Sequence, residues 1–272
     1  MKQSGISMQR SNFLLLLIGS VFGLISFTWP LYLPDSEFPL FQPDNARILA
    51  LLIALIAVVL IAIEISSGAL DAKAVAILGV LSALIAALRL VGAGAVGVEP
   101  MWFLLILASY TFGATFGFSL GVISLAASAL ITGGIGPWLP FQMLAAGWIG
   151  MLAGAFSKIT YRNPKMRLEL LLLVSIGVVC SLSFGLLMDL QLWPWLTGTD
   201  TQLSYIAGAA IWENSQRFMV FHLATALAWD LPRAITTGVL IWLTARPVLN
   251  SFRRARLRLN LTSHEIQPAA HV

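Results

Sequence analysis

A few polar side chains stand among aromatic residues in a chain that is otherwise strongly apolar. The polar residues and the tryptophans near them are Glu99, Trp102, Trp138, Gln142, Asp189 and His222. Polar groups that converge among aromatic rings suit a small-molecule pocket, because the rings stack on a flat ligand and the polar groups fix its orientation. We therefore expect these six residues to form a substrate-binding site.

A second chemical pattern is Gly117-Phe118-Ser119-Leu120-Gly121, which matches the G-x-S-x-G motif of serine hydrolases, with His222 as a conceivable base. That motif requires a strand-to-helix elbow, whereas here it lies in an apolar helical run. Gly113 extends the four-residue spacing of the glycines, which favours close helix packing. An intramembrane serine hydrolase stays as an alternative, and it requires a reactive Ser119.

Asp230 and Arg233 are charged residues inside the last apolar stretch. Charge near the middle of a membrane is costly, and residues three apart share a helix face, so we expect them to neutralise each other as an intramembrane pair. A structural pair and a pair that lines the substrate path remain equally open. Ion coupling through this pair in a self-sufficient secondary transporter is a further alternative.

Neither a nucleotide site nor a metal site is indicated. The sequence contains no G-x-x-x-x-G-K-[ST], so it cannot hydrolyse ATP through a P-loop. It has one cysteine and three histidines, with no H-E-x-x-H. We expect no metal and no cofactor in this chain.

The elements that must position these residues are apolar helices. The chain has 272 residues, of which 58% are hydrophobic and 10% charged, and its mean hydropathy is +0.88. Spanning a bilayer takes about 20 apolar residues per helix. On this basis we predict an all-α integral membrane protein of about eight transmembrane helices, at 12–33, 47–66, 73–91, 100–113, 114–132, 140–158, 169–191 and 217–244.

The basic residues predict the orientation of these helices. With this set of spans, 12 of the 16 Lys and Arg residues lie on the side of the two termini. Cytoplasmic loops are enriched in Lys and Arg, so we expect both termini in the cytoplasm. The loops at 34–46, 92–99, 133–139 and 192–216 then face outward, and a site built near them would open to the outside.

Small residues form a stripe in the third span, at Gly79, Ala83 and Ala87. Such a stripe lets another helix approach closely. That helix belongs either to this protein or to a second membrane subunit, for which the stripe would be a docking face.

Three sequence segments resemble a known family. They are EPMWFLLIL at 99–107, TFGATFG at 111–117 and GGIGPWLPFQM at 133–143. They are similar to the substrate-binding S component of energy-coupling factor (ECF) transporters, the ATP-driven importers of vitamins, and the third segment looks most like the cobalamin-type variant. Ala114 stands where the family often has proline. The resemblance covers about residues 73 to 244.

This resemblance implies an architecture and a function. We expect two extra transmembrane helices in residues 1–72, a six-helix substrate-binding core in 73–245 and a basic cytoplasmic tail in 246–272. The protein would capture a vitamin in the cell membrane without being an enzyme. Its partners would be an ECF coupling transmembrane protein, which meets the Gly79, Ala83 and Ala87 stripe, and two cytoplasmic ATPase subunits that use ATP. The solute and the role of the two extra helices do not follow from the sequence.

Overall fold

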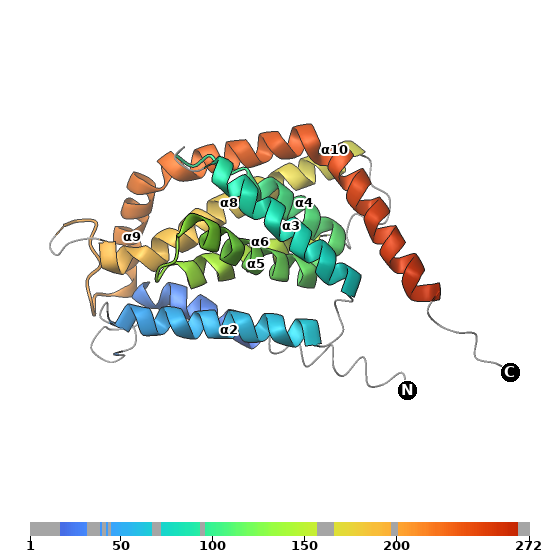
Figure 1. The fold of residues 1–272 in the computed structure, drawn as a ribbon. Helices are drawn as coiled ribbons and strands as arrows, with labels where there is room; N and C mark the ends of the chain where they lie inside the picture. Colours follow the sequence, from blue (N-terminus) through green and yellow to red (C-terminus); the bar gives the residue numbers. More distant parts are fainter. Residues whose placement is uncertain are drawn as a thin grey trace.

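The protein is built from helices, with no strand in the part of the chain that the structure describes (Figure 1). That part, in a computed structural model, comprises residues 17–31, 39, 42, 45–66, 72–92, 96–156, 166–196 and 201–265. A first helix at 17–28 continues into the short 3-10 helix η1 (Trp29–Leu31). The other helices are α2 (Ala46–Ser66), α3 (Ala72–Val91), α4 (Met101–Phe112), α5 (Ala114–Thr132), α6 (Leu139–Ala155), α8 (Met166–Leu196), α9 (Ile211–Thr225) and α10 (Leu227–Glu265).

Their length and apolar character fit a multi-pass membrane protein. Three helices are long and apolar enough to cross a bilayer, namely α3, α5 and residues Arg167–Leu196 of α8. Four shorter apolar helices lie at Leu17–Leu31, Ile48–Ile63, Met101–Phe112 and Leu139–Ala155. The all-helical prediction is confirmed, while the count of eight spans stays a prediction.

The predicted span at 217–244 is not one helix. The structure ends α9 at Thr225 and begins α10 at Leu227, with Ala226 as a turn between them. No glycine or proline stands at this break, and apolar residues continue across it. The hydropathy pattern therefore predicted one span where the structure has two helices. The predicted loop at 192–216 is also shorter, because α8 runs through Pro194 to Leu196 and α9 begins at Ile211.

The residues expected to form a C-terminal tail continue α10 as far as Glu265. Figure 1 shows α10 passing along the top of the molecule and then turning downward. Its second half packs on other helices, since Phe252 lies 5.7 Å from Phe112 between ring centroids. Arg253 pairs with the buried Glu169. Residues 246–265 therefore continue the last helix, which packs on the core at Phe252 and Arg253.

Glycines bring α5 and α6 into backbone contact. A Cβ on Gly117 would lie 2.3 Å from the Gly150 oxygen, and one on Gly121 would lie 2.2 Å from the Ala146 oxygen. The four-residue spacing thus serves helix packing, as expected for Gly117 and Gly121. Gly113 does not take part in this helix contact. It forms the junction of α4 and α5, where its φ of 105° is one that other residues rarely adopt.

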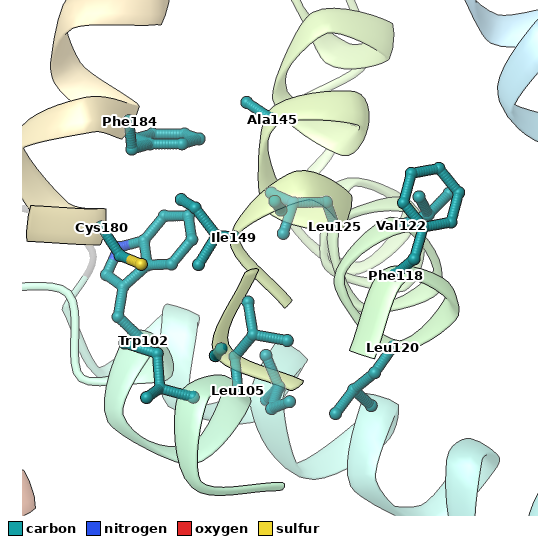
Figure 2. Packing of buried hydrophobic residues seen from close by; sticks show 14 of the residues in the cluster. Trp102, Leu105, Phe118, Leu120, Val122, Leu125, Ala145, Ile149, Cys180 and Phe184 are labelled. Atoms are coloured by element: carbon teal, nitrogen blue, oxygen red, sulfur yellow. The ribbon is translucent and has the colours of Figure 1, made fainter. Parts of the chain in front are cut away.

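The core lies where the central helices meet. Figure 2 shows Trp102 from α4, Leu125 from α5, Ile149 from α6, and Cys180 and Phe184 from α8 packed together. All five side chains are buried. This packing places the first turn of α4 against the middle of α8.

The two N-terminal helices belong to the same body. Phe27 is fully buried, and its ring lies 5.1 Å from that of Phe141 on α6. Trp148 donates from Nε1 to Ser20 Oγ at 3.0 Å. Next along the chain, Trp29 packs against Tyr205 in the segment that precedes α9, at 5.7 Å between ring centroids.

Candidate functional site

A buried guanidinium joins two carboxylates at the centre of the candidate site. Arg233 on α10 donates from Nε to Glu99 Oε2 at 2.9 Å and from Nη1 to Asp230 Oδ1 at 2.6 Å. The side chains of Arg233 and Asp230 are only 6% and 4% exposed. The expected charge pair is therefore present in the structure as part of a triad, with Glu99 as its third member.

Two glycines that the sequence analysis did not single out make this triad possible. Gly97 has φ 66°, and a Cβ there would lie 2.2 Å from the Trp229 oxygen, so the segment before α4 touches the start of α10. A Cβ on Gly185 would lie 1.9 Å from Asp230 Oδ1. Both contacts link segments far apart in sequence, so no local pattern indicated them.

Two aromatic rings pack against the triad. Trp102 is 1% exposed and donates from Nε1 to Glu99 Oε2 at 2.5 Å. Its ring lies 4.5 Å from that of Phe184, and the Arg233 guanidinium lies 5.2 Å from the same Phe184 centroid. The arginine thus gains a cation–π contact in addition to its ion pairs. Phe184 on α8 is another residue that the sequence analysis missed.

Asp189 and His222 form a second polar group beside the triad. His222 Nδ1 lies 2.9 Å from Asp189 Oδ2, and the Thr225 hydroxyl donates to the same oxygen at 3.4 Å. Asp189 lies one helical turn along α8 from Gly185, the glycine against which Asp230 packs. The Asp189 and His222 pair joins α8 to α9 at the end of α9 next to Ala226.

Gln142 lies in a third group, around Arg89. Arg89 donates from Nη2 to Gln142 Oε1 at 3.1 Å and from Nη1 to Ser128 Oγ at 3.3 Å. The sequence analysis did not single out Arg89, because nothing local to it indicates contact with α5 and α6.

The six predicted residues do not all meet in one group. Glu99 and Trp102 touch each other, and so do Asp189 and His222, while Gln142 contacts Arg89 instead. Trp138 stands apart at the N-cap of α6, one turn before Gln142, and is 42% exposed. It therefore lies at a helix end and not in the middle of a loop. Binding of a solute by these residues stays a prediction.

One hollow lies outside these groups. It has a volume of about 310 Å³ and is lined by Gln202, Glu213, Gln216, Arg217 and Val220. Arg217 Nη2 pairs there with Glu213 Oε1 at 3.1 Å. None of the six predicted residues lines it.

The small-residue stripe of α3 faces outward. Gly79, Ala83 and Ala87 are all exposed, and a Cβ on Gly79 would meet no atom within 4 Å. These residues therefore do not pack inside the described part of the protein. Docking of a partner on them stays a prediction.

The hydrolase-like motif has no elbow. Gly117 to Gly121 lie inside α5, and Ser119 is fully buried. The geometry on which a nucleophilic serine depends is that of a strand-to-helix turn. The arrangement therefore does not favour the hydrolase alternative.

Comparison with known proteins gives one match. A family model described as ECF transporter, substrate-specific component, matches residues 73–245. Searches of curated proteins and of solved structures found no match. The matched segment contains all six predicted site residues and the triad.

Proposed function

The chain belongs to the family of ECF transporter substrate-specific components, and from this premise we propose that it captures a vitamin or related micronutrient at the outer side of the cell membrane. Members of this family are transport subunits and not enzymes. They work with a transmembrane coupling protein and ATPases. In our proposal these partners supply ATP-driven uptake, and both termini of this chain face the cytoplasm.

The observation that carries the proposal is the ion triad among aromatic rings. Ionisable residues inside a membrane protein are costly and are kept where they line a solute or ion path. Here Glu99, Asp230 and Arg233 come from two distant segments within the family-matched region. The Asp189 and His222 pair lies in the same matched region, one turn along α8 from the contact of Gly185 with Asp230. Together these groups supply the convergent polar atoms of a binding site.

The resemblance of the segment at 133–143, which ends in the first turn of α6, extends the proposal to the cargo and the partner. We propose cobalamin or a precursor as the solute on the basis of Gly136-Pro137-Trp138-Leu139-Pro140-Phe141-Gln142. The exposed Gly79, Ala83 and Ala87 face of α3 would dock the coupling protein. The core that binds and docks would be residues 73–245, preceded by two additional helices in 1–72.

The proposal is tested by titrating the purified full chain with a panel of vitamins and precursors, cobalamin and cobinamide included. Calorimetry is the method, because coloured ligands absorb tryptophan fluorescence. We expect one compound to bind in a one-to-one ratio. Trp138→Ala should weaken that binding about two- to tenfold, because an aromatic contact is worth ~0.5–1.5 kcal/mol.

Trp212→Ala is the matched control, since Trp212 is 71% exposed on α9. We expect it to bind like the wild type. Equal affinity of Trp138→Ala and the wild type would count against the segment at 133–143 as the site. Absence of binding across the panel would count against capture of a vitamin.

Energy coupling needs a separate measurement. Uptake into vesicles is expected to require the coupling protein and the ATPases together with ATP. Uptake that persists without them and collapses with an ionophore would instead support an ion-coupled transporter.

A further inference from the structure

Three arginines in the described part of the chain form ion pairs, whereas Arg254 and Arg256 donate to the backbone oxygens of Asn250 and Thr111. Those three have carboxylate partners: Arg233 with Glu99 and Asp230, Arg253 with Glu169, and Arg217 with Glu213. Arg89 forms no ion pair with a described residue, and its hydrogen bonds go to the neutral oxygens of Ser128 and Gln142. Arg89 is half-buried, and a guanidinium that loses part of its hydration without gaining a counter-ion is at a disadvantage. Its retention here therefore calls for an explanation.

Membrane anchoring does not explain the direction of this side chain. An arginine at a helix end ordinarily extends toward water and lipid headgroups. Arg89 instead reaches Ser128, which is fully buried on α5, and Gln142 on α6. The side chain therefore points into the helix bundle.

Glu99 does not form an ion pair with Arg89. Glu99 Oε2 instead accepts hydrogen bonds from Arg233 and Trp102. An arginine has five N–H donors, and the contacts to Ser128 and Gln142 use two of them. About three donors of Arg89 thus lack a described protein acceptor.

An accessible aromatic surface lies at the same end of α6. The Gln142 N–H donates to the Trp138 oxygen at 3.0 Å, so the two residues are one helical turn apart. Trp138 is 42% exposed. A cation held by α5 and α6 and an exposed ring are therefore neighbours on one helix end, an arrangement that suits an anionic ligand.

We propose that Arg89 binds a carboxylate or phosphate group of the captured solute, so that the cargo carries at least one anionic group. The inference rests on the proposed capture function and names the chemical class of its cargo. The planar guanidinium presents parallel donors that match both anions. In this arrangement Gln142 and Ser128 are positioning residues, because their oxygens hold the guanidinium in place.

The test is a calorimetric titration of the full chain, in uncharged detergent, with pairs of compounds that differ by one anionic group. Suitable pairs are nicotinate and nicotinamide, pantothenate and pantothenol, biotin and its methyl ester, pyridoxal 5′-phosphate and pyridoxal, and cobinamide phosphate and cobinamide. We expect the acidic member of one pair to bind about tenfold or more tightly than its neutral partner, as a charged hydrogen bond allows. This comparison needs no variant and so does not depend on a variant's folding.

Substitutions then assign the preference to Arg89. Arg89→Gln should abolish most of the difference between acid and neutral compound, and Arg89→Lys should retain part of it. Arg217→Gln is the matched control, because Arg217 lies outside the group and has Glu213 as partner. It should leave the preference unchanged. Gln142→Leu, which removes an orienting contact, should weaken binding of the acid several-fold.

The outcomes separate this inference from the function on which it rests. Equal binding of both members of a pair, or an acid preference that survives Arg89→Gln, would overturn the inference and leave capture standing. No binding in any pair would overturn capture and the inference with it. A lipid headgroup is the other source of phosphate. If phosphatidylglycerol raises the Tm of the wild type but not of Arg89→Gln, and the solutes show no acid preference, the anion is lipid and the inference is wrong.

Discussion

Arg233 is the residue on which the candidate site depends most. It is bonded to Glu99 and Asp230 and also donates from Nη1 to the Ser181 oxygen at 3.4 Å. A buried charge is tolerated only when it is paired and hydrogen-bonded. Removing Arg233 would therefore leave two carboxylates facing each other with no direct cation between them.

We expect Arg233→Gln to destabilise the protein by about 3–5 kcal/mol, the typical cost of breaking a buried ion pair. Thermal unfolding in detergent measures this as a lower Tm. The double variant Asp230→Asn, Arg233→Gln should lose much less than the sum of the two single losses, because it removes one stranded charge. Additive losses would show that the two residues do not act as a pair.

At the scale of elements, α5 and α6 are held at a distance that only glycine permits. The contact is reciprocal, since a Cβ on Gly150 would lie 2.0 Å from the Gly117 oxygen. α6 begins with Gln142 in its first turn, and α5 carries Ser128. The separation of these two helices therefore also sets the place of Arg89.

Gly117→Ala should destabilise the protein by about 1–3 kcal/mol, because its methyl group forces the two backbones apart. Gly79→Ala is the matched control, as it makes the same change in open space on α3. It should be neutral or stabilise by ~0.5–1 kcal/mol through the better helix propensity of alanine. The two Tm shifts are compared in one preparation. Similar shifts for both variants would contradict the close packing.

At the scale of the whole molecule, the two N-terminal helices cover one side of the core. α2 packs mainly on α6, whereas α3 packs on α5 with its small-residue stripe outward. Figure 1 shows α2 running below α5 and α6, with α3 on another side. Trp29 also lies 6.1 Å from Trp195 between ring centroids, at the end of α8. The extra helices thus extend the core and leave the α3 face uncovered.

Phe27→Ala tests whether these helices are integral to the fold. Phe27 is fully buried and also lies 5.6 Å from the Trp148 ring, so its loss should cost about 3–5 kcal/mol. Leu24→Ala, in the same helix but 50% exposed, should have little effect. A Tm of Phe27→Ala equal to that of the wild type would mean that the N-terminal helices fold separately from the core.

Sequence alone determined the helical membrane architecture, because apolar runs of span length and glycines at four-residue spacing are local patterns. It also indicated the family, which the match over 73–245 confirms. The six site residues were chosen by type and by their place near predicted span ends, and their role in binding remains to be tested. The sequence did not predict the helix break at Ala226, because no glycine or proline stands at that position.

Only the tertiary structure decided which polar groups meet. Glu99 lies 134 positions from Arg233, and Arg89 lies 53 positions from Gln142, so no periodicity within one helix relates them. Gly97 and Gly185 matter for the same reason, since each makes room for a group from α10. Helices form from short-range patterns, whereas ion pairs depend on how those helices pack. The inference that the cargo carries an anionic group therefore depends on the contacts of Arg89 in the folded protein.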